Sequence, residues 1–282
     1  MRILVTGASG LLGSAMIKIF ENKFKVYATS KSDCLGHRPK NFKKFNLNEN
    51  SYSELLKWAK PDIIVHNAAI TDLDFCEMNE DIAFEINANS LEKFSLYSKD
   101  IKIIFISSDA VFPLKSSMSR EYDVLGPHNV YGISKLKAEK ILIKSGINYT
   151  IIRTTIVGLN ENTKNDNFVS WIIKSANSGE KITLFQDVVF CPISIWDLVK
   201  EIEFIISNVE DKILHVSGSE KISKYEFGKK ICNHLNLNSD LISSGSIKDF
   251  NFLAKRSSDQ TLDCSLYEKI SGRNLPDVKD TI

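Results

Sequence analysis

The residues of this chain best suited to chemistry are a tyrosine and a lysine four positions apart, Tyr131 and Lys135. They lie in a segment with helical spacing of apolar residues, so both side chains share one face of the expected helix. A lysine beside a phenol favours the phenolate and lowers the pKa of the tyrosine. Such a tyrosine can pass a proton to a carbonyl oxygen while hydride arrives at the carbon. By spacing alone, an uncoupled pair on a helix surface is the better interpretation, because such pairs are common.

A glycine-rich turn near the start of the chain indicates dinucleotide binding. An apolar run typical of a buried parallel strand, Ile3–Val5, leads into Gly7, Gly10 and Gly13, and a helical pattern follows from Leu11. A diphosphate needs a tight turn, a close backbone approach and a helix N-terminus that points its amides at it. An ordinary strand–turn–helix corner with glycines for steric reasons is the alternative.

The elements that must position these residues alternate between strand-like and helix-like patterns. Strands are expected at Arg2–Thr6, Lys25–Ala28, Lys43–Phe45, Asp62–His66, Lys102–Ile106 and Tyr149–Arg153. Helices are expected at Leu11–Asn22, Ser51–Ala59, Glu80–Ser98 and Val130–Ser145. This alternation implies right-handed βαβ crossovers and therefore an α/β fold built on a doubly wound parallel sheet.

Two motifs together resemble one superfamily. The sequence TGASGLLG, which contains the three glycines, resembles the glycine motif of the extended short-chain dehydrogenases/reductases, and YGISK, which begins at Tyr131, matches their Y-x-x-x-K motif about 120 residues later. The resemblance implies a Rossmann-type fold and a hydroxyl residue after the fifth strand. It assigns Ser108 the substrate carbonyl, Tyr131 the proton and Lys135 the cofactor ribose. Without the resemblance, Ser107 and Ser108 could simply cap the next segment.

The same resemblance implies the cofactor contacts. They are expected at Gly7, Ser9, Gly10, Leu11, Leu12, Ser30, Lys31, Asn46, Leu47, Asn67, Ala68, Ala69, Ser107, Tyr131 and Lys135. The second strand is followed by Ser30 and Lys31, and no acidic residue comes before Asp33. NAD binders usually place a carboxylate there for the ribose hydroxyls, so this sequence favours NADPH, with NADH as the alternative.

The alternation breaks after about residue 155. Helices are expected at Asn167–Ser178, Ile195–Ser207 and Lys224–His234, with short strands at Ile182–Leu184 and Ile213–Val216. The stretch Leu241–Ser265 is polar and irregular. We expect a dinucleotide-binding domain over residues 1–155 and a smaller, mainly substrate-binding lobe over residues 156–282, with segments interwoven. That lobe would lie over the carboxyl ends of the strands, where open α/β sheets bind ligands.

Further segments resemble the dTDP-4-dehydrorhamnose reductases. They are FISSDAVFP, the run from His66 to Asp74, IRTT at 152–155, DVVFCPISIWD at 187–197, and the stretch from Arg256 to Asp263. The resemblance implies an NAD(P)H-dependent reductase of a nucleotide-activated 4-keto-6-deoxy sugar, in deoxysugar and cell-surface polysaccharide biosynthesis. It implies substrate contacts at Ser108, Asp109, Ile156 and Arg256, the last of them to the diphosphate.

The sequence also departs from that family. Ala110 and Ile156 stand where the family has tyrosine and tryptophan, and Val188, Phe190 and Ser257 replace its glutamine, glycine and proline. These departures leave the cofactor chemistry in place and question the specificity for rhamnose.

Three related classes can be compared with this pattern. Sugar-nucleotide 4,6-dehydratases need an acid and a base after the hydroxyl residue, and Ala110 cannot act as a base. No cysteine follows Ser108 closely, as epimerase-reductases of the GDP-fucose synthase type require. The regulatory subunit of methionine adenosyltransferase, which resembles the same reductases and binds a dinucleotide without catalysis, remains the alternative.

Composition limits the remaining classes. The chain has 282 residues and a formal net charge of +1, so no electrostatic attraction to nucleic acid is indicated. Its five scattered cysteines form no C-x-x-C pair, which argues against a disulfide framework or a metal site. We found no apolar run of membrane-spanning length and no room for a signal peptide before the first strand. We therefore expect a cytoplasmic protein, with a homodimer left open.

Overall fold

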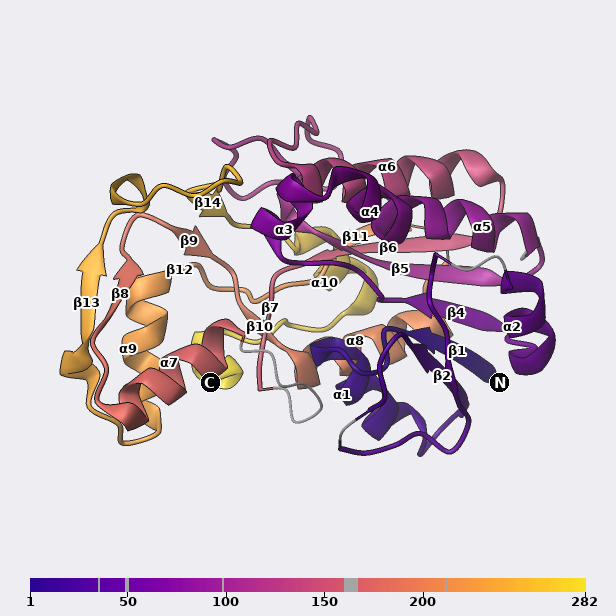
Figure 1. Ribbon diagram of the computed structural model, residues 1–282, viewed down its shortest axis with the longest axis horizontal. Coiled ribbons are helices and arrows are strands. Elements are labelled where there is room, and N and C mark those ends of the chain that lie inside the picture. Colours follow the sequence, from indigo (N-terminus) through magenta and orange to yellow (C-terminus); the bar gives the residue numbers. More distant parts are fainter. Residues whose placement is uncertain (35, 49–50, 98, 160–166, 211) are drawn as a thin grey trace.

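A parallel sheet of seven strands forms the larger part of the protein (Figure 1). The computed structural model describes residues 1–34, 36–48, 51–97, 99–159, 167–210 and 212–282. The strands are β1 (Arg2–Thr6), β2 (Lys25–Ser30), β3 (Phe42–Lys44), β4 (Ile63–His66), β5 (Lys102–Ser108), β6 (Tyr149–Thr154) and β11 (Lys212–His215). Their order is β11-β6-β5-β4-β1-β2-β3, and every pair is parallel.

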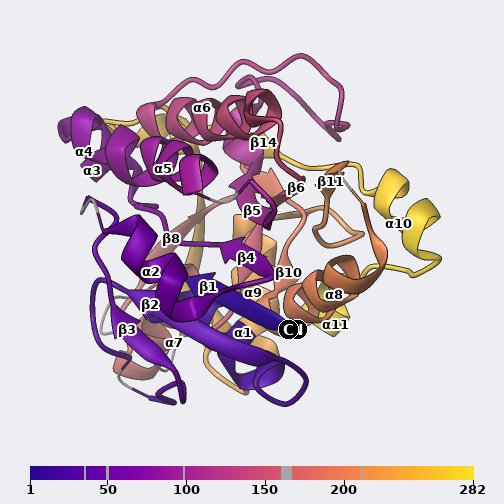
Figure 2. The same ribbon diagram turned by 90° about the vertical axis from the view of Figure 1, so that its right-hand side faces the viewer.

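Helices cover both faces of this sheet, as Figure 2 shows from the side. Helices α1 (Leu11–Phe20) and α8 (Ile195–Asn208) lie on one face, and α2 (Tyr52–Ala59), α5 (Ser90–Tyr97) and α6 (Val130–Ser145) lie on the other. Strand β1 shows why both faces are filled: Ile3 and Val5 pack in the core beneath α1 and α8, and Leu4 packs in the core beneath the other helices. A continuous apolar run suits a strand that is buried on both sides.

The strand order reverses at β1, since β2 and β3 lie on one side of it and β4, β5 and β6 on the other. Crossovers therefore run in opposite directions from this point, and a crevice opens at the carboxyl ends of β1 and β4. The glycine turn follows β1 directly.

A smaller group of elements lies beyond the carboxyl ends of the strands (Figure 1). It contains α7 (Phe168–Ser178), β8 (Ile182–Phe185), β9 (Val189–Phe190), β12 (Ile222–Ser223), α9 (Lys224–His234), η3 (Ser239–Leu241), β13 (Ile242–Gly245), η4 (Ile247–Asp249) and β14 (Asp259–Gln260). A separate apolar cluster around Ile172, Phe190 and Phe227 holds it together. The expected fold class, a doubly wound parallel sheet with a smaller C-terminal lobe, is confirmed.

The chain passes between the two parts more than once. Strands β7 (Ile156–Val157) and β10 (Ile193–Ser194) pair with each other, and α8 and β11 then return to the large sheet. Two C-terminal helices, α10 (Ser265–Ser271) and α11 (Val278–Thr281), complete the fold. The division at residue 155 stays a prediction, and α8 and β11 are the interwoven segments.

The expected helix at Glu80–Ser98 is interrupted, and Ser98 lies outside the described residues. The structure has α3 (Leu73–Met78), which the sequence did not predict, then α4 (Glu80–Phe84), a π-helical turn η1 (Glu85–Asn89) and α5. The π turn carries Asn87, whose amide exchanges hydrogen bonds with the backbone of Ile70 and also donates to Ser134 of α6. Single π turns inside α-helices are frequent near functional sites.

Candidate functional site

The glycine turn has the geometry of a phosphate cradle. Gly7 adopts φ +71°, and a Cβ there would lie 2.8 Å from the Cα of Ala68. The Gly10 amide donates to the Gly7 carbonyl at 2.9 Å, and α1 begins at Leu11 without a side-chain cap. The first amides of α1 are therefore available to an anion. Any larger residue at Gly7 would collide with Ala68 and distort the turn. The turn and the free amides of α1 fit a dinucleotide diphosphate.

A hydroxyl ties the turn to the neighbouring strand end. Thr6 accepts hydrogen bonds from the amides of Asn67 and Ala68, both at 3.1 Å, and its oxygen lies 3.0 Å from Nδ1 of His66. Burial lowers the pKa of His66 to about 3, so the ring is neutral in this contact. The predicted cofactor residues after β4 are thus held against the turn.

The other predicted cofactor residues differ in how deeply their side chains are buried. The side chains of Leu12 and Leu47 are buried in the two cores, so only their backbone groups can face a ligand. Ser9, Asn46 and Ala69 are partly buried. These five positions stay predictions as contacts.

The end of β2 carries the residues expected to choose between NADH and NADPH. Lys31 is exposed, and Ser30 is buried and donates to the carbonyl of Ser32 at 2.5 Å. The sequence analysis missed Lys44, which aligns with Ser30 across the β2–β3 pair and lies 2.6 Å from Asp33. Only the register of the parallel β2–β3 pair places Lys44 beside Ser30.

The three predicted catalytic residues come from β5 and α6. Ser108 ends β5, and Tyr131 and Lys135 lie in the first two turns of α6. The helix approaches the strand end very closely, because a Cβ on Gly132 would lie 2.3 Å from the carbonyl oxygen of Ala110. Glycine at this position is what allows Tyr131 to reach the neighbourhood of Ser108.

The pKa of Tyr131 differs from the sequence-based expectation. Burial raises the pKa of its phenol, a hydrogen bond with Ser108 lowers it, and the charge of Asp109 raises it again. The expected lowering by Lys135 is not found. The Lys135 amine instead donates to the backbone carbonyl of Ile106 at 2.6 Å.

Lys135 is 2% exposed, and its amine lies 4.2 Å from the centroid of the Phe105 ring. Burial lowers the pKa of Lys135 to about 7, although the charge of Glu139 acts in the opposite direction. The amine is therefore poised to change its charge near neutral pH, which is a property expected of a functional lysine.

Ser107 faces a buried ion pair behind the strand end. Its hydroxyl donates to Glu139 at 2.5 Å, and Glu139 accepts two further hydrogen bonds from Arg153 at 2.7 and 3.0 Å. Glu139 and Arg153 are each 1% exposed. The network continues from Arg153 to the Glu121 carbonyl and to His215 of β11. It fixes Ser107 beside Ser108 and couples β5, β6, β11 and α6.

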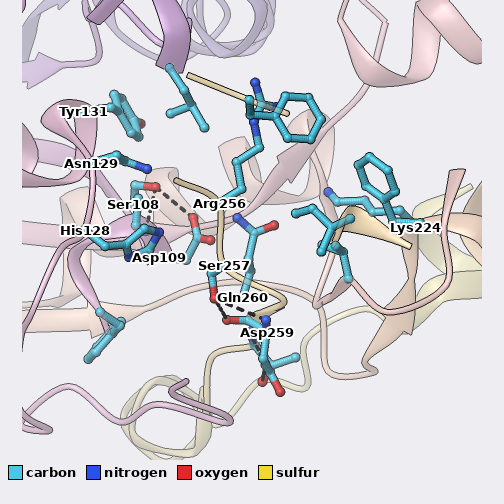
Figure 3. A pocket seen from close by; sticks show the side chains of 18 of the residues that line it. Ser108, Asp109, His128, Asn129, Tyr131, Lys224, Arg256, Ser257, Asp259 and Gln260 are labelled. Atoms are coloured by element: carbon cyan, nitrogen blue, oxygen red, sulfur yellow. Dashed lines mark hydrogen bonds between the residues drawn. The ribbon is translucent and has the colours of Figure 1, made fainter. Parts of the chain in front are cut away.

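A cavity of about 580 Å³ opens between the sheet and the smaller lobe (Figure 3). Its polar and charged lining includes Ser108, Asp109, His128, Asn129, Tyr131, Lys224 and Arg256, and its aromatic lining is Phe112, Phe168, Trp171, Phe185, Phe250 and Phe252. Ser108 donates to Asp109 at 2.8 Å, and burial raises the pKa of the Asp109 carboxyl. The hydroxyl, the phenol and the carboxyl thus meet in one wall of the cavity.

Arg256 reaches the cavity from the C-terminal segment. Its Nη2 lies 3.1 Å from a carboxylate oxygen of Asp74, and its guanidinium lies 3.9 Å from the ring centroid of Phe252. Asp74 also accepts from the amide of Ala254, and Asn129 at the start of α6 donates to the carbonyl of Lys255. These bonds hold the segment across the cavity.

The structure does not bring Ile156 to the cavity. Ile156 lies in β7, pairs with Ile193 and packs against the core beneath α1 and α8, and it is absent from the described residues that line the cavity. Ala110 does line it. Backbone pairing of β7 with β10 decides this orientation, and neither strand was predicted from the sequence.

Sequence reasoning missed Lys224 and most of the aromatic lining. Lys224 begins α9 and lies across the cavity from Tyr131 in Figure 3. Burial lowers the pKa of Lys224 to about 8, and the charge of Asp109 acts in the opposite direction. No motif surrounds Lys224, so the sequence carried no signal for it.

The fold, the cradle and the paired Ser108 and Tyr131 define an extended short-chain dehydrogenase/reductase. The chain belongs to the family described as RmlD substrate binding domain, whose model matches residues 1–282. No helix in the described ranges is long and apolar enough to span a bilayer, and these ranges contain no metal-binding group of His, Cys, Asp or Glu residues.

Three known proteins illustrate the similarity. A crystal structure of dTDP-4-dehydrorhamnose reductase from Bacillus anthracis in complex with NADP has a TM-score of 0.89 and 25% identity, over 99% of this chain and 96% of that one. The "Probable low-salt glycan biosynthesis reductase Agl14" of Haloferax volcanii is 27% identical, over 100% of this chain and 96% of its own. Methionine adenosyltransferase 2 subunit beta of Pongo abelii is 30% identical, over 98% and 84%.

Proposed function

We propose that this protein is an NADPH-dependent oxidoreductase that reduces the keto group of a nucleotide-activated 4-keto-6-deoxy sugar. The observation that carries the proposal is the position of Ser108 and Tyr131 in the wall of a cavity, at the same sheet edge as the glycine cradle. Similarity to a dTDP-4-dehydrorhamnose reductase and to a glycan biosynthesis reductase supports the substrate class and a place in polysaccharide biosynthesis.

The cradle around Gly7 and the start of α1 would hold the cofactor diphosphate. When bound, the reduced nicotinamide supplies hydride to the keto carbon. Tyr131 donates its proton to the keto oxygen as charge develops there, and its raised pKa keeps the phenol protonated until that moment. The Ser108 hydroxyl, which donates to Asp109 in this structure, turns to the keto oxygen and holds it.

Lys135 contributes through its charge. Its amine, bonded to the Ile106 carbonyl, lies beneath the site on the same helix as Tyr131. A protonated Lys135 favours the phenolate that remains after proton transfer. Its pKa of about 7 makes this contribution dependent on pH.

NADPH is favoured over NADH as the reductant. The end of β2 offers Ser30 and the exposed Lys31, and Lys44 lies beside Ser30 across the strand pair. The crystal structure from Bacillus anthracis contains NADP, which agrees with this choice. A homodimer and a cytoplasmic location remain parts of the proposal that size-exclusion chromatography and cell fractionation would test.

The competing function is that of a regulatory subunit without catalysis of its own. The 30% identity to methionine adenosyltransferase 2 subunit beta favours it. A site without catalysis does not need its reactive groups, whereas Ser108, Tyr131 and Lys135 are all present in this chain. Their presence argues for an enzyme. Turnover by the purified chain alone distinguishes the two functions.

The test is a substrate panel. The purified protein is supplied with dTDP-, UDP-, GDP- and CDP-linked 4-keto-6-deoxy sugars, and oxidation of NADPH is followed. We expect turnover with at least one of them, and we expect another sugar to exceed dTDP-4-keto-rhamnose, because alanine replaces the family tyrosine at position 110 in the cavity wall. Absence of oxidation with the whole panel, in a protein that binds NADPH, would favour the regulatory function.

A further inference from the structure

Among the described residues, the cationic side chains of Lys224 and Arg256 line the cavity, and they differ in the partners that they already have. The Arg256 guanidinium is bonded to the Asp74 carboxylate at 3.1 Å and stacked on Phe252. In the described part of the chain, the Lys224 amine makes no hydrogen bond and lies over two aromatic rings. A protonated amine has three donors to satisfy.

The aromatic rings fix the position of the Lys224 amine without satisfying its donors. The amine lies 3.4 Å from the centroid of Phe190 and 4.8 Å from that of Phe168. A ring face attracts a cation through its quadrupole, and this attraction is strongest where water is excluded. The backbone amide of Lys224 is anchored to the Val188 carbonyl at 2.9 Å. The rings and this anchor therefore hold the amine at the edge of the cavity.

The carboxylate of Asp109, which interacts electrostatically with Lys224, already has a hydrogen-bond partner. Asp109 raises the pKa of Lys224 electrostatically, but a carboxylate oxygen of Asp109 accepts the Ser108 hydroxyl at 2.8 Å. The two residues stand on different sides of the cavity in Figure 3. Both residues line the cavity, and an anionic ligand bound in it would accept hydrogen bonds from the Lys224 amine.

We propose that Lys224 binds an anionic oxygen group of the substrate in this cavity, which deepens the proposed function and rests on it. In a nucleotide-activated 4-keto-6-deoxy sugar, C6 is a methyl group, so the diphosphate supplies the anionic oxygens. Lys224 thereby acts together with Arg256, whose Nε is buried and lacks a partner in the described ranges. Charge-assisted hydrogen bonds of this kind are about twice as strong as neutral ones.

Equilibrium binding tests this without any turnover. Calorimetry would measure UDP, dTDP, UDP-glucose and UDP-glucuronate on the wild-type protein and on Lys224→Met, Lys224→Gln and Lys224→Arg. Lys230→Met is the matched control, because Lys230 is exposed on the same helix and is not among the described residues that line the cavity. Unchanged thermal unfolding would show that each variant is folded.

We expect Lys224→Met and Lys224→Gln to weaken one ligand class by at least about tenfold, and Lys224→Arg to retain most of the affinity. Loss of UDP and dTDP affinity identifies the diphosphate. Unchanged UDP affinity with a selective loss for UDP-glucuronate would mean that Lys224 binds a carboxylate at C6, which overturns both the diphosphate contact and a 6-deoxy substrate. The proposal is overturned if neither class loses affinity, or if the wild-type protein binds none of the four ligands. A protein that oxidises no NADPH in the substrate panel but loses affinity in the Lys224 variants would contradict the proposed function and leave the Lys224 contact standing.

Discussion

The glycine cradle and the cavity lined by Ser108 and Tyr131 are built by opposite means. The cradle uses one short stretch of chain, and its contacts to a ligand come from backbone amides around Gly7 and Leu11. The cavity uses side chains from many elements, from Ser108 at the end of β5 to Lys224 in α9 and Arg256 near the C-terminus. A backbone site tolerates almost no added atoms, whereas a side-chain site can change its lining and keep its reaction.

The departures from the family lie outside the cradle, and three of the five line the cavity. Thr6 and the three glycines of the cradle match the superfamily motif. Ala110, Val188 and Ser257 line the cavity, whereas Ile156 and Phe190 are not among its described lining residues. Among the described residues, Phe112, Phe168, Trp171, Phe185, Phe250 and Phe252 supply the rest of the aromatic lining. The glycine turn therefore indicates the class of reaction, and the lining of the cavity indicates the substrate.

The largest expected effect comes from breaking the cradle with a single carbon. Gly7→Ala would place a Cβ 2.8 Å from the Ala68 Cα and also strain a backbone at φ +71°. We expect measurable NADPH binding to be lost. Gly146→Ala is the matched control, since Gly146 has the same φ and no atom within 4 Å of its Cβ position. It should cost about 1 kcal/mol of stability and leave binding intact. Equal losses in both variants would mean that strain, not the cradle, is responsible.

The next effect tests the reaction in the cavity wall. Tyr131→Phe removes one hydroxyl, so turnover should fall by at least about a hundredfold, the usual range for a general acid. NADPH affinity should change little, because the cradle is untouched. Initial rates and a fluorescence titration would measure the two quantities. Full turnover in the folded variant would show that another group protonates the substrate.

The titration of Lys135 gives a smaller effect, visible in stability. Burial lowers the pKa of Lys135 in the folded protein to about 7 from its ordinary value of 10.5, so between these pH values the unfolded chain holds a proton that the folded chain does not. Wild-type stability should therefore gain up to about 1.4 kcal/mol per pH unit from this residue as the pH rises. The stability of Lys135→Met relative to wild type should decline from pH 7 to pH 10 in urea denaturation. A constant difference would contradict the lowered pKa.

The smallest effect concerns cofactor choice at the open rim of the cradle. Lys31 is exposed, so its attraction to a 2′-phosphate is worth about 0.2–1 kcal/mol, or at most about fivefold in affinity. Lys31→Ala should narrow the preference for NADPH over NADH by that amount, measured by calorimetry at low salt. Lys40→Ala, another exposed lysine, should leave the preference unchanged. Tighter binding of NADH by the wild-type protein would reverse the assignment.

The sequence alone determined the parts that depend on neighbouring residues. Strand β1, helix α6 and helix α9 begin and end where apolar periodicity predicts, and Gly7 in the turn and the placement of Tyr131 and Lys135 on one helix follow from local spacing. These features could be predicted because the physical cause, a hydrophobic pattern or a missing Cβ, lies within a few residues of its effect.

The residues that line the cavity could be identified from the tertiary structure alone. Lys224 and the aromatic lining reach it through the packing of the smaller lobe, and Ile156 turns away because β7 pairs with β10. The tertiary structure also reversed the expected pKa shift of Tyr131, since burial raises the pKa more than the hydrogen bond with Ser108 lowers it, and the Lys135 amine is bonded to Ile106. Burial and long-range pairing depend on residues far apart in the chain, so no local pattern contains them.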